Sequence, residues 1–188
     1  MARQENSNAV MHNARGMFAK QVVFRERAGK VYLSGPPKKR KNRKPTAPQA
    51  VIQDRFRAAV DFAKMVMEDP ELKAAYKKVA LPGQTAYNMA FKDAFNPPVV
   101  TRIFAQGYRG VVGDSIIVQA KDDFKVGHIT VAIFNSANEL IEEGPCVVVD
   151  KRSWGYTVTQ ANASLAGTKI KASAFDLPEN EGTLEVTL

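Results

Sequence analysis

The sequence has little of the chemistry on which most enzymes and metal sites depend. Its 188 residues include one cysteine, two histidines and one tryptophan. The single cysteine, Cys146, excludes an intramolecular disulfide, and with only His12 and His128 beside it there is no spaced Cys/His set for zinc. No apolar run approaches the roughly 20 residues that a membrane-crossing helix needs. A Walker A loop and a dinucleotide-binding glycine loop are absent too, so no cofactor is expected.

The first ten residues are polar, and no apolar stretch follows their few basic residues, which predicts no signal peptide. The lone cysteine fits a reducing compartment. We therefore expect a protein without a transmembrane segment that is cytoplasmic or incorporated in a particle.

Charge is distributed unevenly along the chain. The net charge is +8, but residues 1–95 hold 19 Lys and Arg against 8 Asp and Glu, whereas residues 96–188 hold 8 against 11. A basic part favours an anionic partner. The same asymmetry would also let the basic half of one copy meet the acidic half of another.

The N-terminal region predicts a hairpin and an arm. Two β-prone runs, 18–24 and 30–33, flank a glycine-containing connection and indicate a β-hairpin. The proline-rich and positively charged segment 34–45 follows, and its repelling charges predict an extended arm or loop.

Helical signals fill residues 46–96. Thr46 with Gln49 fits a capping box, and an apolar stripe follows at helical spacing. The stripe consists of Ile52, Phe56, Ala59, Ala63 and Val66. Asp69 with Pro70 predicts the start of a second helix, while 81–83 and 96–98 predict the ends of the second and third.

From residue 97 onward, short β-prone runs alternate with turn residues, which indicates a sandwich or barrel. The runs are 111–112, 116–118, 129–134, 146–149, 156–159, 170–175 and 184–188. Trp154-x-Tyr156, then Gly167, then a run ending at Asp176, resembles bacterial immunoglobulin-like domains, over about residues 99–188. The resemblance implies a fold and no activity.

The expected fold class is α+β: an N-terminal β-hairpin and helical segment followed by an Ig-like antiparallel β-sandwich. Three domains are predicted. They are 1–45 (arm, hairpin and basic loop), 46–96 (helical segment) and 97–188 (Ig-like sandwich).

The strongest candidate contact site is the basic run at 38–44, in which six of seven residues are Lys or Arg. These are Lys38, Lys39, Arg40, Lys41, Arg43 and Lys44. Such a run neutralises phosphates in salt-sensitive, sequence-independent nucleic-acid binding. It also suits anionic lipid or an acidic protein patch. The alternative is a solvated charged loop.

Other chemistries have weaker support. A nucleophilic pair of Cys146 and His128 is conceivable, but 145–149 has the pattern of a buried strand, where a thiol behaves as a small hydrophobe. The carboxylates at 122–123, 142–143 and 176 could meet to bind calcium, although turn roles explain them more simply. We predict no catalytic residue and no metal site.

A second resemblance covers about residues 16–60. The order of a strand at 22–24, a Pro-Lys arm at 37–39, Thr46-x-x-Gln49 and a helix containing Arg55-Phe56 is similar to that of a family of small uncharacterised bacterial proteins. This resemblance implies no activity.

Together these features favour a non-enzymatic structural or assembly subunit, of a phage-like particle, a filament or a surface layer, whose basic arm contacts neighbouring subunits. Self-association or other assembly subunits are the expected partners. The alternative is a nucleic-acid-binding accessory protein that binds phosphates through the Lys/Arg arm.

Overall fold

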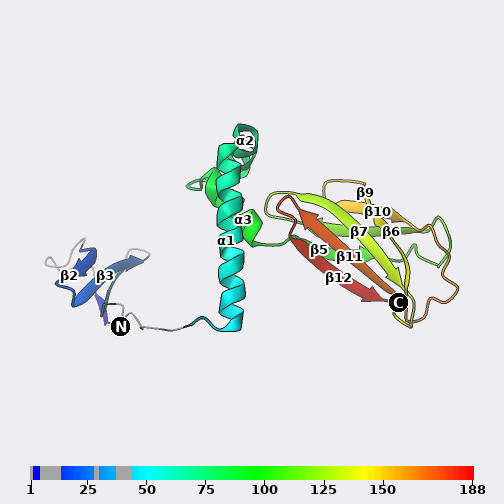
Figure 1. Cartoon of the computed structure of the whole chain (residues 1–188), viewed down its shortest axis with the longest axis horizontal. Coiled ribbons are helices and arrows are strands. Elements are labelled where there is room, and N and C mark those ends of the chain that lie inside the picture. Colours follow the sequence, from blue (N-terminus) through cyan, green and yellow to red (C-terminus); the bar gives the residue numbers. More distant parts are fainter. Residues whose placement is uncertain (1, 5–13, 28–29, 37–43) are drawn as a thin grey trace. The chain divides into compact units, whose positions relative to one another are not determined.

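The computed structural model describes residues 2–4, 14–27, 30–36 and 44–188 (Figure 1). The chain separates into two compact units, residues 1–45 and residues 46–188. No helix within the described residues is both long enough and apolar enough to cross a membrane. The further boundary expected between residues 96 and 97 stays a prediction.

The first unit contains one antiparallel sheet of four strands in the order β1-β4-β3-β2. The strands are β1 (Ala2–Gln4), β2 (Gly16–Phe18), β3 (Val22–Arg27) and β4 (Lys30–Ser34). The predicted β-hairpin is confirmed as β3 and β4, and β1 and β2 add to its two sides.

The β-prone run 18–24 contains a turn and is not one continuous strand. Ala19 and Lys20 both have positive φ, 49° and 57°, and the Gln21 N–H donates to the Phe18 carbonyl at 3.0 Å. Two adjacent residues with positive φ match the right-handed twist of a tight hairpin. Neither residue is a glycine or asparagine, so the sequence carried no turn signal at this point.

Three helices open the second unit, and side-chain caps define their starts. They are α1 (Ala47–Glu68), α2 (Pro70–Val79) and α3 (Ala86–Phe95). The Gln49 side-chain oxygen accepts from the Thr46 N–H at 3.1 Å, as the capping box requires. Asp69 Oδ1 accepts from two backbone N–H groups at the start of α2, at 2.8 and 3.1 Å. The three predicted helices are confirmed.

The apolar stripe of α1 is buried along only part of its length. Ala59, Ala63 and Val66 are fully buried, but Ile52 and Phe56 are 57% and 52% exposed. The buried part packs with Tyr76, Met89 and Ala90 of α2 and α3. The first two members of the predicted stripe thus lie outside this buried cluster, because α2 and α3 are too short to cover all of α1.

Two antiparallel four-stranded sheets form the C-terminal part, with strand orders β5-β6-β10-β9 and β12-β11-β7-β8. The strands are β5 (Val99–Phe104), β6 (Ser115–Lys121), β7 (Val126–Phe134), β8 (Leu140–Pro145), β9 (Val147–Val148), β10 (Ser153–Thr157), β11 (Lys169–Asp176) and β12 (Glu181–Thr187). The predicted β-sandwich is confirmed. Two predictions within this part are wrong. The β-prone run 111–112 lies in an exposed turn, and in 145–149, predicted as a buried strand, Val147, Val148 and Val149 are 73%, 67% and 61% exposed.

The core between the two sheets follows from alternation along the strands. Every second residue of β6 and β11 is buried, as are Ile129, Val131 and Ile133 of β7, so each strand presents an apolar face to the other sheet. The fully buried aliphatic side chains include Ile116, Val118, Ile129, Val131, Ile133 and Ile170. Trp154 and Tyr156 of β10 complete this core.

Polar contacts join the helices to one end of the sandwich. Asn180, in the β11–β12 turn, donates to the Ala94 carbonyl at 3.3 Å and to Asp176 Oδ2 at 2.8 Å. Lys92 Nζ lies 2.7 Å from Asp123 Oδ1 in the β6–β7 loop. The helical segment is thus attached to two neighbouring sandwich loops.

Candidate functional site

Most of the predicted basic contact site lies outside the described residues. Lys38, Lys39, Arg40, Lys41 and Arg43 belong to the segment 37–43, and only Lys44 of the six is described, as an exposed side chain. Contact between this arm and an anionic partner therefore stays a prediction.

Among the described residues of the first unit, no helix or second sheet packs on its sheet. Among the residues of this unit whose side chains are described, none is buried, and Met17 and Phe18 are 54% and 70% exposed. The valines of β3 and the Tyr32 and Leu33 side chains of β4 are half-buried. A sheet gains stability when its apolar face packs against another element, so this surface is suited to a partner.

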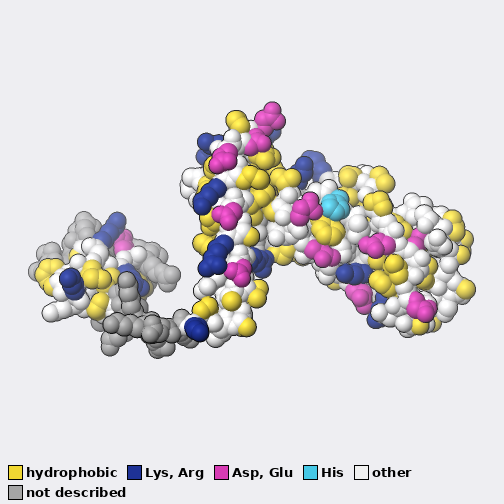
Figure 2. All heavy atoms as spheres, viewed as in Figure 1, with side chains coloured by type: hydrophobic (Ala, Val, Ile, Leu, Met, Phe, Trp, Pro, Cys, Tyr) yellow, Lys and Arg dark blue, Asp and Glu magenta, His cyan; other side chains and the backbone are white. Residues whose placement is uncertain are grey.

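A second exposed apolar surface lies at the start of α1. Val51 and Ile52 are 68% and 57% exposed, and Figure 2 shows hydrophobic side chains at the surface over this end of the helix. Phe56 is anchored against α3, with its ring centroid 5.0 Å from that of Phe91. We call Val51 and Ile52 the α1 apolar patch.

Buried carboxyl groups meet where α3 joins the sandwich. Tyr76 Oη donates to Asp93 Oδ2 at 2.6 Å, and both side chains are fully buried. Burial raises the pKa of Asp93 to about 7, the Tyr76 hydrogen bond lowers it, and a hydrogen bond with Asp122 raises it. Burial also raises the pKa of Asp176, opposed by hydrogen bonds from Asn180.

A proton on Asp93 resolves an otherwise costly arrangement. Asp93 Oδ1 and Asp122 Oδ1 are both buried. If both carboxyl groups were ionised, each of these oxygens could only accept a hydrogen bond, and neither would have a donor among the described residues. A protonated Asp93 can donate to Asp122, the hydrogen bond that raises the pKa of Asp93, and this bond would satisfy both oxygens. The cluster is therefore a proton-holding junction. Among the described residues no three His, Cys, Asp or Glu side chains group as a metal site.

Glu142 of β8 performs a structural task. Its Oε2 accepts from the Thr159 N–H at 2.9 Å, the Thr159 hydroxyl at 2.6 Å and the Gln160 N–H at 3.2 Å. Burial, followed by the hydrogen bond with Glu142, raises the pKa of Tyr156 to about 12. The carboxylate thereby holds the segment that follows β10, in one sheet, against β8 in the other.

The conceivable nucleophile is poorly placed for catalysis. Cys146 is half-buried, and burial raises the pKa of its thiol to about 12. His128 stacks on Phe175, with ring centroids 4.5 Å apart. A thiolate is the reactive form of cysteine, so little of this side chain is activated near neutral pH.

We expect Cys146 to be alkylated by iodoacetamide at about pH 8 at least tenfold more slowly in the folded protein than in urea. The reaction is followed by mass spectrometry of the intact chain. Equal rates in the two states would contradict the burial of the thiol, and urea-unfolded protein serves as the internal control because the chain has a single cysteine.

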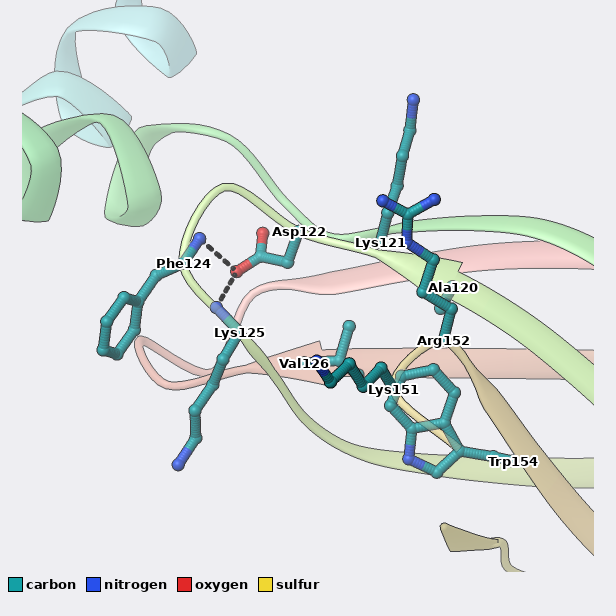
Figure 3. Close-up of a pocket in the computed structure, with 9 residues that line it drawn as sticks. All are labelled: Ala120, Lys121, Asp122, Phe124, Lys125, Val126, Lys151, Arg152 and Trp154. Atoms are coloured by element: carbon teal, nitrogen blue, oxygen red, sulfur yellow. Dashed lines mark hydrogen bonds between the residues drawn. The ribbon is translucent and has the colours of Figure 1, made fainter. Parts of the chain in front are cut away.

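A basic hollow lies at the end of the sandwich where the β6–β7 loop meets the β9–β10 turn (Figure 3). It has a volume of about 270 Å³ and is lined by Ala120, Lys121, Asp122, Phe124, Lys125, Val126, Lys151, Arg152 and Trp154. We name these nine residues the basic hollow. Sequence reasoning missed it because its basic residues come from two segments about 30 residues apart, and only strand pairing between β6 and β10 brings the segments together.

Comparisons with known proteins find only distant structural similarity. No protein-family model matches the chain, and no curated protein matches it. One similar solved structure is the "Crystal Structure of engineered protein at the resolution 1.98A, Northeast Structural Genomics Consortium Target OR128". It is 13% identical, with a TM-score of 0.32, and the match covers 57% of this chain and 27% of that chain. The chain thus spans about a quarter of the length of that protein.

Proposed function

We propose that the chain is a non-enzymatic structural or assembly subunit, of a phage-like particle, a filament or a surface layer, that contacts neighbouring subunits through residues 1–45 and the start of α1. One observation carries the proposal: no described side chain of the first unit's sheet is buried. A sheet whose apolar side chains stay partly exposed gains little from hydrophobic burial and is stabilised when another surface covers it.

Charge and hydrophobicity indicate which surface is available. Residues 1–45 hold 12 Lys and Arg against 2 Asp and Glu, whereas residues 46–188 hold 15 against 17. The second unit also carries the α1 apolar patch. The first unit of one copy against the second unit of another is a head-to-tail contact, which builds a ring or an open filament.

The strand orders support the resemblance to immunoglobulin-like domains. Numbered from β5, the sheets read A-B-E-D and G-F-C-C′, which is the arrangement of an immunoglobulin sandwich with one added strand. Such a sandwich serves as a body that carries binding surfaces, and the fold by itself names no partner. The likeness of residues 16–60 to small uncharacterised bacterial proteins is also part of this proposal.

The test is the mass of the purified full chain over a range of concentrations, by sedimentation velocity. We expect oligomers whose mass rises with concentration, and a shift toward monomer in the double variant Val51→Gln, Ile52→Gln. The control is Val111→Gln, Val112→Gln, which replaces two adjacent aliphatic side chains of similar exposure, 59% and 58%, on the sandwich. It is expected to keep the wild-type mass distribution.

Two results would contradict the proposal. One is a wild-type chain that stays monomeric at every concentration. The other is equal loss of association in the test and control variants, since that would indicate general surface hydrophobicity and not the α1 apolar patch.

The excess of ten positive charges in residues 1–45 supports a second candidate function, binding of nucleic acid. In that case the affinity for single-stranded DNA falls steeply with salt because counterions are released. Replacing Lys38, Lys39, Arg40, Lys41, Arg43 and Lys44 with Gln would remove this salt dependence. Association that persists in the Gln variant, with no salt-dependent DNA binding in the wild type, favours the assembly subunit.

A further inference from the structure

Half of the positive charge of the sandwich is gathered at one place. Residues 97–188 contain eight Lys and Arg, and four of them line the basic hollow. Those four are Lys121, Lys125, Lys151 and Arg152, and all are exposed. The sandwich as a whole is acidic, so this concentration of like charge is unfavourable unless an anion offsets it.

The four basic side chains have no ion-pair partner within the described residues. Elsewhere on the same sandwich, Lys169 and Lys171 lie 4.0 and 3.9 Å from carboxylates of β12. The one carboxylate that lines the hollow, Asp122, is already engaged: its Oδ2 accepts from the backbone N–H groups of Phe124 and Lys125 at 3.2 and 3.1 Å. The donors of the hollow are therefore available to a ligand.

The backbone around the hollow is held in place. The Ala120 N–H donates to the Arg152 carbonyl at 3.3 Å, and the Arg152 N–H donates to Asp150 Oδ1 at 2.8 Å. Trp154 is 7% exposed and belongs to the sandwich core. The hollow thus combines a rigid base with long, flexible charged side chains at its rim, which can turn toward a bound charge.

Figure 3 shows where the four basic side chains lie around the hollow. Lys121 and Arg152 extend together on one side, and Lys125 extends on the other. Lys151 lies between them beside Val126. Positive charge therefore surrounds the hollow and is not confined to one edge.

We propose that the basic hollow binds a small oxyanion of the phosphate class that carries at least two negative charges. Four cations and one carboxylate leave a net charge of +3. A single carboxylate offsets little of it, a phosphate monoester offsets up to about two charges, and a diphosphate offsets more. Ammonium and guanidinium groups form short, charge-assisted hydrogen bonds with phosphate oxygens. A volume of 270 Å³ is at the lower end for ligand pockets and suits a compact group.

The chain contains its own reporter for this site. Trp154 is the only tryptophan of the sequence and lines the hollow, so its fluorescence reports on binding there. We expect titration of the full chain with pyrophosphate to give a saturable change in this fluorescence.

The test variant is Lys151→Gln, Arg152→Gln, and the charge-matched control is Arg102→Gln, Arg109→Gln, which removes two exposed cations elsewhere on the sandwich. We expect the test variant to bind pyrophosphate at least about tenfold more weakly, and the control to change by less than about twofold. A second pair, Lys121→Gln, Lys125→Gln, gives the same comparison should the first variant fold poorly.

The source of the phosphate is distinguished in a parallel titration with phosphatidylcholine vesicles, with and without phosphatidic acid. A response to the phosphatidic acid vesicles that pyrophosphate competes away assigns a lipid headgroup, whereas a response to pyrophosphate alone assigns a soluble phosphate. The proposal is overturned by a fluorescence that does not saturate with either probe, or by equal weakening in the test and control variants. Neither outcome depends on whether the chain assembles.

Discussion

Gly182→Ala is expected to destabilise the second unit by more than about 3 kcal/mol, the range that marks severe core disruption. A Cβ atom at this position would lie 1.7 Å from the Pro98 carbonyl oxygen and 2.8 Å from its carbonyl carbon. Two non-bonded atoms cannot approach so closely, so the start of β12 must move away from the segment that enters β5. That movement also disturbs the Asn180 contacts with α3. Urea denaturation followed by circular dichroism measures the loss.

Gly113→Ala is the matched control for this substitution. Gly113 has a φ of 94°, but a Cβ there would meet nothing within 4 Å. Its expected cost is about 1–2 kcal/mol, from the left-handed backbone alone. If Gly182→Ala lowers the free energy of unfolding by no more than Gly113→Ala, this result would contradict the close packing of Pro98 on β12.

The second large expected effect is a loss of stability as pH rises. The pKa of Asp93 is about 7 in the folded protein, above its ordinary value of 3.8. Between these values the folded state holds a proton that the unfolded state has released, so the free energy of unfolding falls from about pH 4 to about pH 7 and then levels off. We expect a decrease on the order of 2–4 kcal/mol across that window, measured by denaturant titration at each pH.

The substitution Asp93→Asn isolates the contribution of Asp93 to the pH dependence of stability. The asparagine imitates the protonated carboxyl, since its oxygen can accept from Tyr76 and its NH₂ can donate to Asp122. The variant should lose most of the pH dependence and be more stable than the wild type above about pH 7. Asp61→Asn, at an exposed carboxylate of α1, is the control and should follow the wild type.

The described carboxyl groups with a lowered pKa do not mask this loss of stability between about pH 4 and about pH 7. Backbone hydrogen bonds lower the pKa of Asp114 and of Asp150, and the Lys92 and Asn96 contacts lower that of Asp123 against the opposing effect of burial. A carboxyl group whose pKa is lowered on folding stabilises the folded state, and this stabilisation is lost only as the pH falls below the ordinary pKa of the group. Asp176, whose pKa is raised, acts in the same direction as Asp93. An unfolding free energy that rises from about pH 4 to about pH 7 would contradict the proton-holding junction.

Local signals in the sequence were sufficient to predict the helices and most of the strands. Thr46, Asp69 and the proline pair after Asn96 mark helix ends through backbone chemistry that acts within a few residues. The alternation in β6 and β7 likewise reflects a local period of two. These features were predictable because neighbours in the sequence determine them.

Features that depend on distant residues could not be predicted. The exposure of Ile52 follows from the lengths of α2 and α3, and the helical period of α1 is the same whether or not a partner is present. The carboxyl junction requires Asp93, Asp122 and Asp176 to meet from three separate elements. The basic hollow likewise depends on the pairing of β6 with β10. The arm's role stays a prediction, since residues 37–43 lie outside the described part of the chain.

The exposure of the described side chains in the sheet of the first unit has a thermodynamic consequence. Because its described side chains are not buried, its folding gains little free energy from their packing, and in the assembly that we propose the covering surface supplies the remainder. Its folding equilibrium is then linked by mass action to the concentration of that surface. Amide hydrogens of β3 and β4 would exchange with solvent at a rate set by protein concentration, while those of β7 and β11 would not.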